Sequence, residues 1–189
     1  KESRKPRLDT LEILGEPLST KNKWRERNRI IENVPHYTLN KLREQYNIDK
    51  TSLGIVRPTC VRDIIIERSN KDWKPEWREM FRQTRLFGED PKPLFKIPYK
   101  FSYVFECNDS VKPHKASITD WELGMLYINE LKRIGIEKVT AESVKDKYLN
   151  ELCSESRDVR FFMGTFFPYN TWLVLGVYWP PKEGQGFLF

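Results

Sequence analysis

Hydrophobic and polar positions alternate most regularly in the second half of the chain. In the segment YKFSYVFEC, Tyr99, Phe101, Tyr103 and Phe105 occupy every second position, which is the period of a β-strand. The segments RFFMGTFF and NTWLVLGVYW are rich in aromatic and β-branched residues, and a turn sequence separates them. The pattern therefore predicts strands over 6–16, 52–58, 60–69, 99–107, 114–120, 158–167 and 170–179.

Between these strands the apolar residues recur every three to four positions, as they do on one face of a helix. Asp120 stands directly before WELGMLYINELKRI and Gly135 follows it, so this helix has both an N-cap and a C-terminal signal. Thr140 gives the same N-terminal signal for the next helix. Helices are predicted over 19–34, 37–48, 74–87, 121–135 and 140–153.

The strands and helices do not follow the regular rhythm of parallel βαβ units. We therefore expect an α+β fold with a largely antiparallel, OB-like or barrel-like sheet and inserted helices. Three parts are expected along the chain. They are a basic N-terminal strand and helices over 1–50, a β-rich OB-like domain over 51–182 with a helical insertion at 121–153, and a peptide tail over 183–189.

The charge of the chain is positive and unevenly distributed. The 189 residues carry a formal net charge of +6. Residues 1–100 hold 23 of the 33 Lys and Arg residues but only 15 of the 27 Asp and Glu residues. This excess favours a polyanionic partner, DNA or RNA, although mixed charges also serve simply to keep a protein in solution. The basic residues expected to meet phosphate are Lys21, Lys23, Arg25, Arg27 and Arg29.

The aromatic row of the strand over 99–107 has two interpretations. On an exposed face, Tyr99, Phe101 and Tyr103, with Lys100 beside them, would form a platform on which unpaired bases stack. On a buried face the same rings would form the core and pack against the helix over 121–135, which is the commoner place for strand aromatics. The sequence leaves both interpretations open.

Few residues suggest catalysis. His114, Asp120 and Glu122 lie close together in HKASITDWE and are the candidates for an acid–base or metal-dependent nuclease site. The alternative is structural, because Asp120 is well placed to cap the following helix and Glu122 to favour its dipole. No phosphate-binding loop and no nucleophile elbow is present in the sequence.

The three cysteines are widely spaced. Cys60, Cys107 and Cys153 are an odd number, which argues against a disulfide framework and for a reducing, cytoplasmic setting. Cys107 and Cys153 could hold zinc together with His114, but the chain has no CxxC pair and no clear fourth ligand, and no cofactor is expected. No apolar run approaches the roughly 18 residues that span a bilayer, so no membrane association is expected.

Two short segments share the pattern Gln-x-x-Leu-Phe, QTRLF at 83–87 and QGFLF at 185–189. The pattern resembles the peptide with which many bacterial proteins bind the replicative sliding clamp. That resemblance implies that the glutamine bonds to the rim of the clamp pocket and that the Leu-Phe pair fills its apolar subsites. The alternatives are docking on another protein, or packing against the protein's own domain. The residues concerned are Gln83, Leu86, Phe87, Gln185, Phe187, Leu188 and Phe189.

The order of the motifs SLGIVRP, YKFSYVFE with HKASITDWE, and RFFMGTFFPYNTWLVLGVYW resembles the C-terminal part of a prokaryotic domain of unknown function with two OB-type barrels. The resemblance covers about residues 50–180. It implies that residues 1–50 are the end of a truncated first barrel and that the protein has a role in nucleic-acid or genome-conflict biology, such as prokaryotic defence. It supplies no catalytic residues.

Three functions follow from these observations. The first is a non-enzymatic nucleic-acid-associated protein, recruited to the sliding clamp by its QGFLF tail and linked to replication, repair or genome conflict. The alternative is a protein-interaction subunit that does not bind DNA. The second alternative is a metal-dependent nuclease.

Overall fold

The computed structural model describes residues 16, 18–76, 79, 95–166 and 170–182. The chain divides into two compact units, residues 1–33 and residues 34–189. In the first unit, helix α1 runs from Lys21 to Glu32 and Asn33 caps its C-terminus. The Arg27 guanidinium donates two hydrogen bonds to the carbonyl of Leu18, at 2.9 and 2.6 Å, and lies 5.4 Å from the ring centre of Trp24.

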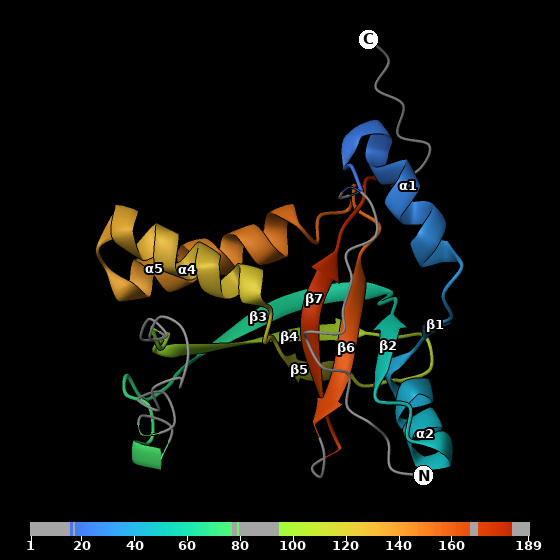
Figure 1. The fold of residues 1–189 in the computed structure, drawn as a ribbon, viewed down its shortest axis with the longest axis horizontal. Helices are drawn as coiled ribbons and strands as arrows, with labels where there is room; N and C mark the ends of the chain where they lie inside the picture. The colour runs from blue at the N-terminus through green and yellow to red at the C-terminus, as the bar shows by residue number, and fades with distance from the viewer. Residues whose placement is uncertain (1–15, 17, 77–78, 80–94, 167–169, 183–189) are drawn as a thin grey trace. The chain divides into compact units, whose positions relative to one another are not determined.

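The second unit contains two sheets, which Figure 1 shows running across one another. The four-stranded sheet has the order β1-β2-β6-β7, and only its β1-β2 pair is parallel. The three-stranded sheet, β3-β4-β5, is antiparallel throughout. The bounds are β1 His36–Tyr37, β2 Leu53–Val56, β3 Cys60–Arg68, β4 Tyr99–Glu106, β5 His114–Ser117, β6 Arg160–Phe166 and β7 Thr171–Tyr178.

The core lies where the two sheets meet. The ring of Tyr103 on β4 stacks on that of Phe161 on β6, with centres 4.6 Å apart, and both side chains are fully buried. Just beyond β5, Ile118 forms an isolated bridge with Val174 on β7, and the N–H of Thr119 donates to the Val174 carbonyl at 2.8 Å. Hydrophobic packing and backbone hydrogen bonds therefore both connect the sheets.

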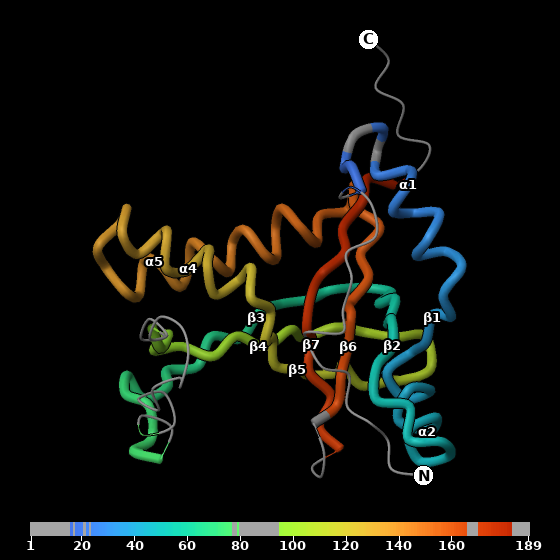
Figure 2. Tube along the Cα trace, in the orientation of Figure 1, coloured from blue at the N-terminus to red at the C-terminus, as the bar shows by residue number. Residues whose placement is uncertain are grey.

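Helices also belong to this unit. Helix α2, Leu39–Asp49, buries Leu39 and Leu42 completely against the core. Helix α4, Trp121–Ile134, leads away from the sheets, and α5, Glu137–Asp146, returns towards them and continues into the short π-helix Lys147–Glu151 (Figure 2). The residues expected to begin and end α4 do so: the N–H of Glu122 donates to Asp120, and Gly135 has the left-handed φ of 76°.

The expected α+β, largely antiparallel architecture with helices inserted between strands is confirmed. The described strands form two separate sheets, and within the described residues no sheet closes into a barrel. Helix α5 begins at Glu137 rather than at the predicted Thr140, because the Thr140 hydroxyl donates back to the Ile136 carbonyl at 2.9 Å inside the helix instead of capping it. All but the last residue of the predicted strand over 6–16, and most of the helix over 74–87, lie outside the described residues.

Among the helices of the described segments, none combines the length and the hydropathy that crossing a membrane requires.

Candidate functional site

The aromatic row on β4 belongs to the core. Phe101 is 3% exposed, and Tyr103 and Phe105 are completely buried. The Tyr103 hydroxyl donates to the backbone carbonyl of Tyr148 at 3.0 Å, and burial raises the pKa of this phenol well above its ordinary value. Because a base cannot stack on a buried ring, Phe101 and Tyr103 do not form the nucleic-acid platform that their spacing also allowed. Strand period alone fixes which residues share a face, but not whether the face is covered.

The beginning of the same strand is different, because it borders an open cavity. This cavity has a volume of about 500 Å³ and lies between the segment 95–101 and the first turns of α4. Its size is within the range of sites that hold small organic groups. Phe101 and Leu123 form part of its apolar wall, and Tyr99, which is half-buried, also lines it.

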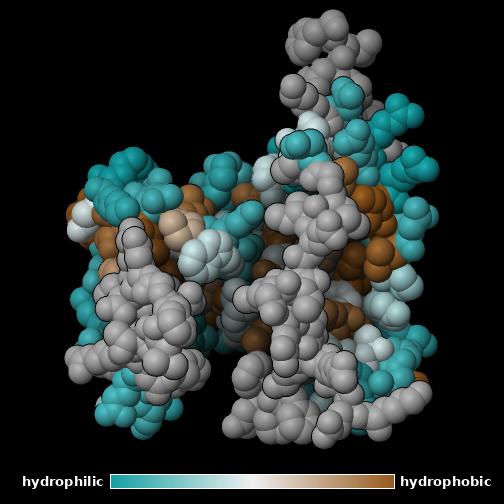
Figure 3. All heavy atoms as spheres, in the orientation of Figure 1, coloured by the Kyte–Doolittle hydropathy of each residue, from teal (hydrophilic) through white to brown (hydrophobic). Residues whose placement is uncertain are grey.

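We call this cavity the aromatic pocket, because three further aromatic residues line it and two of them are exposed. Trp121 is 70% exposed and Phe95 is 54% exposed, and Trp73 is half-buried. Figure 3 shows hydrophobic atoms at the surface of the region formed by α4 and α5. Large apolar side chains that gather around an open cavity are characteristic of binding sites, whereas single exposed ones are ordinary.

Two lysines accompany these rings. The Lys96 ammonium donates to the Asp72 carbonyl at 2.7 Å and lies 5.6 Å from the ring centre of Trp73. Lys100 is exposed, and no described residue forms an ion pair with it. Asp120 is the one acid among the described lining residues, and its carboxylate accepts hydrogen bonds from the Glu122 N–H and from the Tyr148 hydroxyl. The pocket is thus apolar inside and mostly positive at its edge.

Asp120 and Glu122 do not form a site with His114. His114 is the first residue of β5, while Asp120 lies beyond its other end and caps α4. In the described part of the chain, one group of at least three potential metal ligands is found, and it consists of Cys107, Asp109 and His114. The length of β5 separates His114 from Asp120 and Glu122, so the described structure does not group the three residues of the predicted nuclease site, and that activity stays a prediction.

The predicted zinc ligands are brought together only in part. Cys107 and His114 are neighbours, but the Cys153 thiol instead approaches the Tyr103 hydroxyl, at 3.6 Å, and its burial raises its pKa to about 11. Asp109 takes the third place, and sequence reasoning missed it. The signal was available in the spacing Cys-x-Asp followed five residues later by His, within one predicted hairpin.

The basic residues of α1 differ in what they can offer. Arg25 and Arg29 are exposed, whereas Arg27 is held by the Leu18 carbonyl. The side chains of Lys21 and Lys23 lie outside the described residues, as do both Gln-x-x-Leu-Phe segments, 83–87 and 185–189. The sliding-clamp hypothesis therefore stays a prediction.

The comparisons with known proteins place the chain in a family. Residues 35–189 match the model of a family described as a Domain of unknown function (DUF8757). This range nearly coincides with the second compact unit. No curated protein and no solved structure matches the chain significantly. The resemblance to a domain of unknown function is confirmed at that level, while its two OB-type barrels and its link to genome conflict stay predictions.

Proposed function

The chain belongs to the family of the domain of unknown function DUF8757, whose description assigns no activity, and from the geometry we propose that the protein binds single-stranded nucleic acid at the aromatic pocket. The observation that carries the proposal is the exposure of Trp121 and Phe95 beside Lys100, at the mouth of an apolar cavity.

The chemistry of the pocket suits a base followed by a phosphate. An unpaired base offers a flat apolar face, which gains roughly 1–3 kcal/mol by stacking on an aromatic side chain. Lys100 lines the same pocket and forms no ion pair with a described residue, so it can meet the adjacent phosphate, and Lys96 adds a second positive charge. The bases of a duplex are stacked on each other, so the rings of this pocket can reach only a base that is single-stranded.

The net charge of the chain supports the same partner. A charge of +6 attracts a polyanion at low ionic strength, and each phosphate contact releases counterions. Arg25 and Arg29 of α1 are exposed and add to this attraction. Electrostatics of this kind favours nucleic acid in general, whereas the pocket supplies the preference for unpaired bases.

The proposal is tested by the fluorescence anisotropy of a labelled oligothymidylate at increasing salt. Trp121→Ala is expected to weaken binding by about 5- to 150-fold, the equivalent of one stacked base at roughly 1–3 kcal/mol. Lys100→Ala is expected to reduce the slope of log affinity against log salt by about 0.7, the value for one phosphate contact on a single strand.

Lys132→Ala is the matched control, because Lys132 is an exposed lysine in the last turn of α4, at the helix end away from the pocket. The control should bind like the unaltered protein. If Lys132→Ala weakens binding as much as Lys100→Ala, or if Trp121→Ala has no effect, the pocket does not hold the strand. If thymidine monophosphate binds as tightly as the oligonucleotide, the pocket is a nucleotide site and the strand proposal is wrong.

A further inference from the structure

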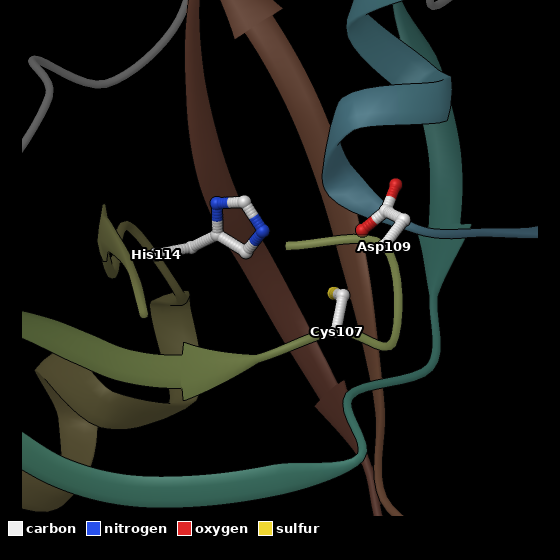
Figure 4. A group of neighbouring side chains, drawn as sticks. All are labelled: Cys107, Asp109 and His114. Carbon is white, nitrogen blue, oxygen red and sulfur yellow. The ribbon is translucent and has the colours of Figure 1, made fainter. Parts of the chain in front are cut away.

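Three potential metal ligands meet where the β4–β5 hairpin passes the N-terminus of α2. Cys107 directly follows β4, Asp109 lies in the turn, and His114 begins β5. The sulfur, one carboxylate oxygen and one ring nitrogen lie within 4.8 Å of one another. Figure 4 shows the ring nitrogen of His114 that is farther from the backbone facing Cys107 and Asp109. Turn and strand pairing thus place all three groups around one point.

His114 has an unused hydrogen-bonding atom inside the protein. Its side chain is 8% exposed, and its buried Nε2 has no hydrogen-bond partner among the described residues. A buried polar atom without a partner costs roughly 1–3 kcal/mol, so it calls for an explanation. The ring is held in place by Phe105, its cross-strand neighbour, whose ring centre is 5.5 Å away.

Cys107 is also buried, at 3% exposure, and it is not part of a disulfide. Burial raises the pKa of its thiol, while a hydrogen bond from the backbone N–H of Leu39, the first residue of α2, acts in the opposite direction. A sulfur so deeply buried is out of reach of a substrate carbon, which argues against a nucleophilic cysteine. A single ion is small enough to reach it.

Asp109 is exposed and is the third member of the cluster, beside Cys107 and His114. Its carboxylate accepts a hydrogen bond from the hydroxyl of Thr38, the residue that caps α2, and no described residue donates a hydrogen bond to its other oxygen. Hydrogen bonds of this kind orient the ligands of metal sites in proteins. The exposure of Asp109 also provides a path of entry from solvent.

From this geometry we propose that Cys107, Asp109 and His114 bind one zinc-type divalent cation, with a water molecule in the fourth position. Thiolate together with imidazole favours zinc over magnesium or calcium, and three protein ligands with one open position are a recurrent zinc arrangement. The ligand atoms of tetrahedral zinc lie roughly 3.4–3.6 Å apart, so the three ligand atoms, which lie within 4.8 Å of one another, need to approach one another by up to about 1 Å.

This site is separate from the aromatic pocket and does not depend on nucleic-acid binding. Its effect would be to fasten the β4–β5 hairpin to the N-terminus of α2. Without the ion this connection includes the Thr38–Asp109 and Leu39–Cys107 hydrogen bonds. Because the ligand atoms converge only in the folded chain, binding would stabilise the folded state.

The test is titration of the metal-stripped full chain with Co²⁺ and then with Zn²⁺. Co²⁺ bound to Cys107 gives a thiolate-to-metal charge-transfer band, and Zn²⁺ should displace it at one ion per chain. Cys107→Ser should abolish the band, and Asp109→Asn should weaken Zn²⁺ binding by about tenfold or more. Asp109→Asn is informative because the side chain is exposed, so the variant keeps its fold, which circular dichroism checks.

Cys60→Ser is the matched control, because Cys60 is an exposed cysteine outside the cluster. The control should retain the band and the affinity of the unaltered protein. If the band survives in Cys107→Ser, if it disappears in Cys60→Ser, or if a folded Asp109→Asn binds Zn²⁺ as well as the unaltered chain does, the proposed site is wrong.

Discussion

Substitutions of Tyr103 test whether the aromatic face of the three-stranded sheet belongs to the core or binds nucleic-acid bases. Its ring stacks on Phe161, and its hydroxyl donates to the Tyr148 carbonyl at 3.0 Å. Tyr103→Phe removes only the hydroxyl, and Tyr103→Ala removes the ring as well. The two substitutions therefore separate the contribution of the hydrogen bond from that of packing.

The expected magnitudes follow from complete burial. Tyr103→Phe leaves the Tyr148 carbonyl without this donor in a buried position, which costs about 1–3 kcal/mol of the free energy of unfolding. Tyr103→Ala also leaves a cavity between the sheets, and losses of about 3–5 kcal/mol are typical for a buried aromatic ring. If the ring were instead a platform on which bases stack, its removal would lower the affinity for the oligonucleotide, by roughly 1–3 kcal/mol per base, and would change the stability little.

The assay is urea unfolding of both variants, with oligonucleotide binding measured on the folded Tyr103→Phe protein. We expect lower unfolding midpoints with unchanged m-values, and unchanged affinity of Tyr103→Phe. Trp121→Ala serves as the reverse control, since its exposed ring should affect affinity and not stability. A Tyr103→Ala protein that is less than about 1 kcal/mol destabilised would refute the assignment of this ring to the core.

Three further predictions concern other parts of the chain. In thermal melts, Gly124→Ala should stabilise the protein by about 0.5–1 kcal/mol, because among the described residues the added methyl group meets Ile97, at an ordinary contact distance of 3.7 Å. Gly135→Ala should instead destabilise the protein by more than about 1 kcal/mol, because the backbone φ of Gly135 is +76°. Zn²⁺ at a hundredfold excess over its dissociation constant should raise the melting temperature by about 5–10 °C, an increase that Cys107→Ser removes. Deletion of residues 184–189 should abolish binding to the sliding clamp of the source organism in surface plasmon resonance; equal binding by both forms, or by neither, would contradict the clamp hypothesis.

Local signals in the sequence predicted local structure well. Asp120 and Gly135 mark the two ends of α4 because an N-cap and a left-handed C-terminal residue act within one helical turn. The prediction that a helix begins at Thr140 was wrong for a related reason. A threonine hydroxyl can also bond back to the carbonyl four residues earlier, and only the surrounding helix decides which bond forms.

The sites were harder to predict because they depend on contacts between distant segments. The period of β4 showed that its aromatics share a face, but the covering of that face by Phe161 comes from β6, almost 60 residues further along. The pairing of Cys107 with His114 instead follows from a single hairpin. Asp109 lies in the turn of that hairpin, so its spacing also indicated it, and the structure adds the hydrogen bond from Thr38 of α2 to its carboxylate.

Strand β5 is only four residues long, yet its register decides the orientation of both proposed sites. His114, Ala116 and Ile118 point inward, while Lys115, Ser117 and Thr119 point outward. A shift of one residue would turn His114 to the solvent, drive Lys115 into the core and displace the residues that lead into the pocket. The length of the turn between β4 and β5 is therefore a shared constraint, and an insertion or deletion of one residue there would disable ion binding and strand binding together.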